Sequence, residues 1–141
     1  MFRIALTGLG LMALLLATPS DPSAQEARAL HDRIITFDAE MDIPFEFMNG
    51  ANDVGTETGM QVDLPKMNRG GLDGALFVSW VLQGERIPTA YATARSDAER
   101  KFAAIENMVQ TYPDRIGLAR TADDAEKLVA EGKHFAVMGM V

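Results

Sequence analysis

Apolar and polar positions along the chain form blocks that predict strands and helices in turn. The β-branched and aromatic run at 34–37 predicts a first strand, and the run ALFVSWVL at 75–82 is apolar on both faces, as in a strand covered on two sides. The final segment HFAVMGMV, 134–141, predicts a third buried strand, and 116–119 a short one. Apolar strands that alternate with amphipathic helices indicate a parallel α/β architecture.

Helices are predicted between these strands from capping residues and apolar stripes. Ser96 and Glu99 have the spacing of a capping box, and the helix they predict ends before Pro113. A second helix is predicted to begin after Thr121 and to close at Gly132, the usual glycine position beyond a last turn. Shorter helical segments are predicted at 23–33 and just after residue 64.

A long loop is predicted at 39–63, between the first two strands. It contains Pro44, Gly50, Gly55 and Gly59 together with several Asn and Asp residues, which favour turns. Loops of this length without regular structure are usually functional lids or binding loops. The segment is therefore the first place to look for a binding site.

Composition limits the classes of function. The 141 residues include 48% hydrophobic and 23% charged residues, which is ordinary for one globular domain. The formal charge of −7 repels a phosphate backbone, so no nucleic-acid partner is expected. There are no cysteines, which excludes disulfides, thiolate metal sites and cysteine nucleophiles. Any metal ion must be held by oxygen or histidine ligands.

The N-terminus has the pattern of an export signal. Arg3 precedes the apolar run at 4–17, and small residues with prolines follow it. The run is shorter than the roughly 20 residues that span a bilayer. We therefore expect a signal peptide at 1–24, cleaved between Ala17 and Ala24, a periplasmic or secreted protein at 25–141, and no stable membrane span after cleavage. The alternative is an uncleaved N-terminal anchor.

Two acidic residues stand two positions apart in the segment FDAEMDIPFEF. In extended backbone, Glu40 and Asp42 point to the same side and can face one ion near the carboxyl end of the first strand. Active sites of barrels and open α/β folds assemble at that end of the sheet. The alternative is that both carboxylates are solvated or cap a turn, and the spacing alone does not decide between them.

Other polar residues are assigned structural roles. His31 precedes the first strand and His134 begins the last one, so both are expected at the end of the sheet opposite the site. Asp63 and Asp73 precede the second strand and are expected to stabilise turns or cap a helix. Phe77 and Trp80 are expected to pack between the sheet and the helices.

Three segments together resemble the membrane (renal) dipeptidases, zinc peptidases of the amidohydrolase-like barrel group. The segments are FDAEMDIPFEF at 37–47, QVDLPKMNRGGLDGALFVSWV at 61–81 and TADDAEKLVAEGKHFAVMGM at 121–140, and they occur in the order found in the family. The first is similar to the family's first-strand pattern of Asp, a small residue, His, any residue, Asp, an apolar residue and Pro. The matching positions are Asp38, Ala39, Asp42, Ile43 and Pro44.

The resemblance implies the N-terminal part of a (β/α)8 TIM-type barrel, incomplete in this chain, from an enzyme that hydrolyses dipeptides with two zinc ions. It implies metal contacts from Asp42 and from Glu40, which stands at the family's histidine position. A carboxylate in place of imidazole favours harder ions such as Mn²⁺ or Mg²⁺. The family's bridging glutamate and later histidines correspond to positions beyond Val141, so the chain alone is expected to be inactive. Dipeptide substrates are the implied partners, with a homodimer as an open alternative.

Two other interpretations remain open. One is a non-catalytic dipeptidase homologue that acts as a peptide- or partner-binding module, and the other is an unrelated exported α/β binding domain. Three or four strands of a barrel leave apolar edges uncovered, so we also expect the isolated chain to be poorly soluble or oligomeric.

Overall fold

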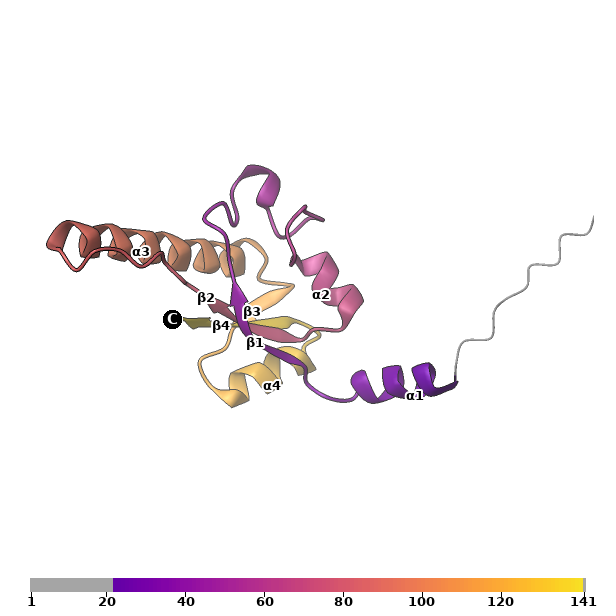
Figure 1. Cartoon of the computed structure of the whole chain (residues 1–141). Coiled ribbons are helices and arrows are strands. Elements are labelled where there is room, and N and C mark those ends of the chain that lie inside the picture. Colours follow the sequence, from indigo (N-terminus) through magenta and orange to yellow (C-terminus); the bar gives the residue numbers. More distant parts are fainter. Residues whose placement is uncertain (1–21, 141) are drawn as a thin grey trace, which may run out of the picture.

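The computed structural model describes residues 22–140, which are organised around a four-stranded parallel sheet (Figure 1). The strand order is β1-β2-β4-β3. The predicted parallel α/β fold is confirmed. The strand β4 lies between β2 and the short β3, and β1 and β3 form the two edges of the sheet. The strands are β1 (Phe37–Asp42), β2 (Gly74–Val78), β3 (Ile116–Leu118) and β4 (His134–Gly139).

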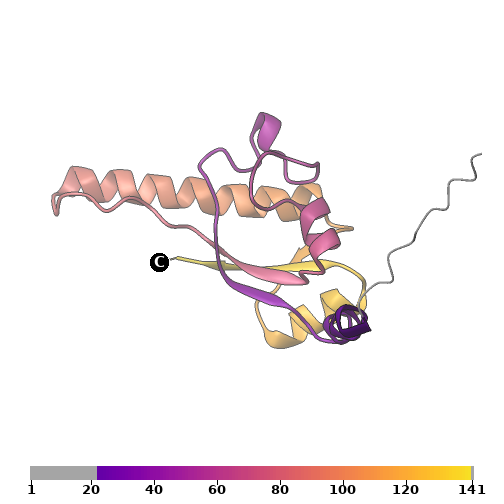
Figure 2. The same cartoon turned by 45° about the vertical axis from the view of Figure 1, so that its right-hand side comes forward.

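Helices cover both faces of this sheet. Figures 1 and 2 agree that α3 and the loop after β1 lie on one side and α4 lies on the other. The amino-terminal part of α3 extends past the carboxyl ends of the strands, whereas α1 lies at the opposite end of the sheet. The helices are α1 (Pro22–His31), the 3₁₀ helix η1 (Gly50–Asn52), α2 (Leu64–Gly70), α3 (Pro88–Thr111) and α4 (Ala122–Ala130).

The capping signals around α4 are confirmed. Thr121 Oγ1 accepts a hydrogen bond from the backbone N–H of Asp124, and the Asp124 carboxylate accepts one from the backbone N–H of Thr121. Each side chain thus satisfies an amide that the first turn leaves without a helical partner. Gly132, with φ of 73°, follows the helix in the left-handed region that favours glycine.

The first strand begins later than predicted. Ile34 and Ile35 are exposed, and β1 runs over Phe37–Asp42 rather than 34–37. Thr36 ends the segment that leads from α1 to β1. Its hydroxyl donates to the Gly71 carbonyl and the Asp73 carboxylate, and its carbonyl accepts a hydrogen bond from the N–H of Gly74. β-branched residues favour strands mainly where neighbouring side chains cover them. Strand propensity alone therefore places the start of β1 too early.

Two other boundaries also differ from prediction. Helix α3 begins at Pro88, eight residues before Ser96, because a proline fits the first helical turn and the following residues are Ala-rich. Strand β2 ends at Val78, so Trp80 lies outside it and is 40% exposed. The prediction that Trp80 packs between sheet and helices is therefore wrong, whereas Phe77 is buried as expected.

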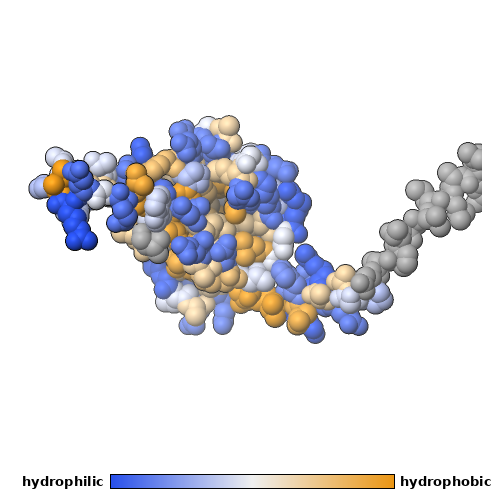
Figure 3. All heavy atoms as spheres, viewed as in Figure 1, coloured by the Kyte–Doolittle hydropathy of each residue, from blue (hydrophilic) through white to orange (hydrophobic). Residues whose placement is uncertain are grey.

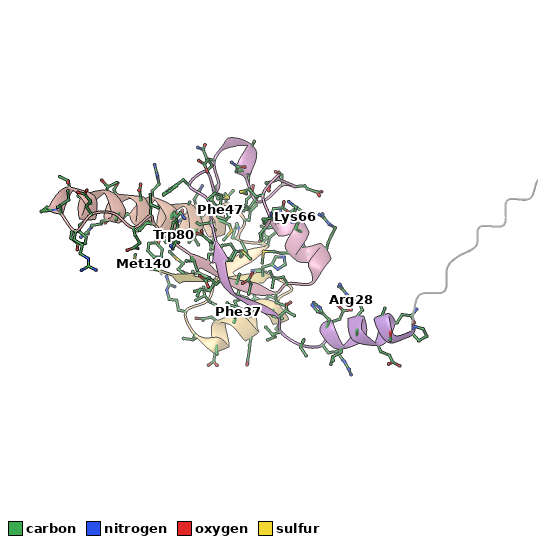
Figure 4. The ribbon with its side chains drawn as sticks, viewed as in Figure 1. Arg28, Phe37, Phe47, Lys66, Trp80 and Met140 are labelled. Carbon is green, nitrogen blue, oxygen red and sulfur yellow. The ribbon has the colours of Figure 1, made fainter. Side chains whose placement is uncertain are left out.

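The core lies between one face of the sheet and the helices α3 and α2 that cover it. Figure 4 shows Phe47, from the loop after β1, on this side of the sheet. Its ring packs on that of Phe77, with 6.1 Å between centroids. The largest fully buried apolar side chains are Phe77, Leu64, Ile105, Met108, Ile116, Val54 and Val78.

Apolar side chains also reach the surface at the open edge of the sheet. Figure 3 shows apolar surface over the middle of the molecule, where β1 faces the viewer. Phe37 on this edge strand is 48% exposed and stacks on Phe135 with centroids 5.7 Å apart. Trp80 and Met140, at the carboxyl ends of β2 and β4, are exposed as well (Figure 4).

Within residues 22–140, no helix has both the length and the apolar character needed to cross a membrane. The predicted signal peptide lies almost entirely in residues 1–21, outside the described part of the chain. Its cleavage remains a prediction.

Candidate functional site

A cavity of about 400 Å³ opens at the carboxyl end of β1. One wall is the end of the strand and the start of the following loop, and the other is segment 59–62, where the same loop returns toward the strand. Asp42 supplies a carboxylate to a lining that is otherwise largely apolar. The lining residues are Met41, Asp42, Ile43, Pro44, Phe47, Gly59, Met60, Gln61 and Val62.

The structure places both predicted acidic residues on β1, and only Asp42 at this cavity. Glu40 and Asp42 are exposed, while Met41 between them is buried, as the alternation of a strand requires. The pairing register with β2 shifts between Asp38 and Met41, so the strand is irregular at Glu40. Asp42 pairs with Val78 at the ends of the two strands.

Asp42 has a partner that was not predicted from the sequence. Lys101 reaches from α3, and its Nζ lies 3.1 Å from Asp42 Oδ1. The lysine side chain is only 4% exposed, whereas that of Asp42 is 55% exposed. The signal was its position: Ala98, Lys101, Ile105 and Met108 follow one another at helical spacing on the buried face of α3, so a charge there needs a partner.

An aromatic ring completes the surroundings of this ion pair. The Nζ of Lys101 lies 5.0 Å from the ring centroid of Phe45, and the guanidinium carbon of Arg100 lies 4.6 Å from it. Both distances are within the range of cation–π attraction. Phe45, three residues past the end of β1, therefore helps to hold the loop against α3.

The described residues do not form a metal site by themselves. No group of three or more His, Asp or Glu side chains in 22–140 is arranged to hold a metal ion. Asp42 has an ammonium group as its counter-ion, and Glu40 offers a second carboxylate without a neighbouring imidazole. Structural and catalytic zinc sites need at least three protein ligands.

The long loop is fastened to the end of α3. The phenol of Tyr112 donates to the Asp53 carboxylate, with distances of 2.5 and 2.7 Å to its two oxygens. This hydrogen bond, followed by burial, raises the pKa of Tyr112 above its usual value. Arg115 donates to the Gly55 carbonyl at 2.6 Å. A Cβ on Gly55 would lie within 1.9 Å of the Tyr112 ring, so the close approach requires glycine there.

A second set of hydrogen bonds, together with an ion pair, joins the wall of the cavity to α2. The buried Asp63 caps the helix by accepting from the N–H of Lys66 at 2.8 Å, and its other oxygen accepts from Thr58. Lys66 Nζ lies 2.9 Å from that carboxylate and donates to the carbonyls of Thr58 and Met60 (Figure 4). The predicted capping role of Asp63 is confirmed.

This network is expected to lower the free energy of unfolding as the pH becomes acid. Burial raises the pKa of Asp63, but the ammonium of Lys66 and the hydrogen bonds from Thr58 and Lys66 outweigh it and lower the pKa from 3.8 to about 2. A lowered carboxyl pKa stabilises the fold above pH 3.8, and the contribution is lost as pH falls toward 2. We expect Asp63→Asn to cost about 2 kcal/mol more at pH 6 than at pH 2. Urea unfolding of both proteins at the two pH values measures the difference, and equal costs would contradict it.

The two histidines lie at the amino end of the sheet, as predicted. His134 begins β4, pairs with Ile116, and is mostly buried. Burial lowers its pKa, against the opposing effect of hydrogen bonds at Leu72 and Asp73. His31 lies close to Gly71, just before β2. Neither histidine is near Asp42, so neither completes a site there.

Known proteins share this fold. The solved structure of the probable dipeptidase PvdM from Pseudomonas aeruginosa has a TM-score of 0.78 and 31% identity over 85% of this chain and 32% of that one. The structure of dipeptidase AC, a metallopeptidase of family M19, has a TM-score of 0.61 and 24% identity over 76% and 35%. A metallopeptidase from Rhodobacter sphaeroides, liganded with a phosphinate mimic of the dipeptide L-Ala-D-Ala, has a TM-score of 0.60 and 22% identity over 76% and 38%.

The likeness to the last two structures is one of fold. This chain spans about a third of the length of all three. No curated protein matches the sequence. The family profile described as membrane dipeptidase (peptidase family M19) matches residues 24–141. The match covers most of the sequence and agrees with the three segments that suggested it, and the chain belongs to the membrane dipeptidase family, peptidase family M19.

Proposed function

We propose that the protein is an exported, metal-dependent dipeptidase and that this chain supplies the first part of its active site. Asp42, in the wall of a cavity of about 400 Å³ at the carboxyl end of β1, is the observation that carries the proposal. Parallel α/β folds place their sites at that end, and pockets for small ligands begin at roughly 300 Å³. A dipeptide is a ligand of suitable size. Membership of the family, and the dipeptide mimic bound to the Rhodobacter sphaeroides relative, support the same substrate class.

Asp42 and Glu40 are the proposed metal contacts. Asp42 stands where the family pattern has its aspartate and Glu40 where it has histidine, and two zinc ions are the proposed cofactor. Carboxylate oxygens suit zinc, and they also suit Mn²⁺ and Mg²⁺. The remaining ligands would have to come from outside the described residues, since these contain no complete cluster. We therefore propose that the 141-residue chain is inactive alone.

The proposal is tested by dipeptide hydrolysis. We expect the longest natural protein that contains this sequence to cleave dipeptides, and we expect EDTA to abolish the activity. Asp42→Asn in that protein should lower kcat/KM by more than about 100-fold, since even residues that only support metal ligands contribute 10- to 100-fold. Glu46→Gln, which changes an exposed carboxylate of the loop after β1 that does not line the cavity, is the control and should retain most activity. Release of free amino acids measures each rate.

Two results would contradict this function. Hydrolysis that is insensitive to EDTA and to Asp42→Asn would remove the metal role of Asp42. Hydrolysis by the purified 141-residue chain would show that this chain does not need further ligands.

The ion pair at Asp42 also favours a second candidate, a non-catalytic module that binds peptides. In this alternative Lys101 balances the charge of Asp42, and the cavity binds a short peptide without a metal. Calorimetric titration of the chain with dipeptides in EDTA separates the two functions. Dipeptide binding in EDTA by this chain, together with no hydrolysis in zinc by the longest natural protein that contains it, would support the second candidate and reject the first.

A further inference from the structure

Asp42 is already bound to a cation that the chain itself provides. Lys101 Nζ is 3.1 Å from Asp42 Oδ1, and the lysine side chain is almost completely buried. Burial of an ammonium group without a counter-charge is costly, so the fold commits the nearest carboxylate to it. In the described part of the chain, Asp42 is the acidic residue within salt-bridge distance of Lys101.

The lysine is held in place from more than one side. Its backbone lies on the buried face of α3 between Ala98 and Ile105, and its ammonium group lies over the ring of Phe45. Asp42 is fixed at the other side of the pair by its position in β1 beside β2. The contact therefore joins two packed elements, β1 and α3, and differs from a flexible surface salt bridge.

From this geometry we infer that Lys101 is a built-in counter-ion of Asp42 that competes with divalent metal ions. A metal ion bound to Asp42 would lie within a few ångströms of the ammonium group, and two cations at that distance repel each other even where water reaches the carboxylate. Metal binding must therefore displace the Lys101 ammonium group, or the bound metal ion must stay beside it and be repelled, which weakens the binding. Lys101 sets how tightly this carboxylate binds metal, which is a role that the family pattern around β1 does not contain.

This inference rests on the proposed metal role of Asp42, but its test does not use hydrolysis. The full 141-residue chain is titrated with MnCl₂ while the electron paramagnetic resonance signal of free Mn²⁺ is recorded. We expect Lys101→Met to bind Mn²⁺ at least about tenfold more tightly than the wild type, because the repelling charge is gone and the methionine still fills the space. Lys101→Arg keeps the cation and should resemble the wild type.

The double variant Lys101→Met/Asp42→Asn locates the gained affinity. We expect it to return to the weak binding of the wild type. Equal Mn²⁺ affinity of Lys101→Met and the wild type would overturn the inference, and so would tighter binding that survives Asp42→Asn. If hydrolysis fails while Lys101→Met still gains Asp42-dependent affinity, the proposed activity is wrong and the inference stands.

A measurement on the wild-type chain keeps the inference testable if Lys101→Met does not fold. Burial and the ion pair should make the Lys101 ammonium group visible in nitrogen–proton spectra of lysine side chains, and Asp42→Asn identifies it by shifting it. We expect about one equivalent of zinc to leave this signal unchanged. A shift of the Lys101 signal at one equivalent would show that metal displaces the lysine readily and would overturn the inference.

Discussion

Replacing Phe77 by alanine is expected to lower the free energy of unfolding by about 3–5 kcal/mol. Phe77 is the next-to-last residue of β2, is 1% exposed, and pairs in register with Met41 and Met138. Its ring also supports Phe47, which lines the cavity beside Asp42. The substitution removes the largest buried side chain between the sheet and α3, and the rigid strands on both sides of it limit collapse into the space.

The matched control is Phe37→Ala on the neighbouring edge strand. Phe37 is 48% exposed and has one aromatic neighbour, Phe135, so its removal should cost only about 1 kcal/mol. Urea unfolding followed by circular dichroism measures both values. Equal losses for Phe77→Ala and Phe37→Ala would mean that the packing between β2 and the loop after β1 is not the main core.

The order of elements was predictable because its signals are local. The apolar runs around Phe77 and Phe135, the capping box at Thr121 and the glycine at 132 each lie within a few consecutive residues, and each gave the correct element. Turn and capping chemistry depends on neighbours in sequence, so it can be read without the fold. Asp63 belongs to the same group, since its cap is closed by Lys66 three residues later.

The boundaries that sequence reasoning misplaced depend on tertiary contacts. Ile34 and Ile35 have high strand propensity, but no neighbouring strand covers them, and β1 begins only where Phe37 pairs with Gly74. The apolar run after Val78 behaves similarly, since β2 ends when β4 no longer lies beside it. Strand ends are set by the partner strand, which the sequence of one segment does not specify.

Of the two charged residues of the candidate site, Asp42 could be predicted from the sequence and its partner Lys101 could not. The position of Asp42 at the carboxyl end of β1 follows from the local pattern and from the family resemblance. Its contact with Lys101 joins residues 59 positions apart, and depends on how α3 lies across the sheet. The charge of a lysine on an apolar helix face indicates that a partner exists but does not identify it.

Asp42→Ala is expected to cost about 3 kcal/mol of folding stability, at the lower end of the range for breaking a buried ion pair. The cost comes mainly from Lys101, whose ammonium group stays buried without its counter-charge. Water reaches the half-exposed aspartate side of the pair, which keeps the value from being larger. Asp42→Asn leaves an oxygen that can accept from Lys101 and should cost less than Asp42→Ala.

A double-mutant cycle assigns this cost. Lys101→Met alone should be close to neutral, because an apolar side chain of similar length replaces a buried charge and Asp42 remains hydrated. Asp42→Ala/Lys101→Met should then recover most of the stability that Asp42→Ala loses, giving a coupling energy of about 2 kcal/mol or more. Thermal and urea unfolding of the four proteins measure it. A coupling below about 0.5 kcal/mol would show that the lysine reaches water without Asp42, and the carboxylate would then be available to a metal ion without competition.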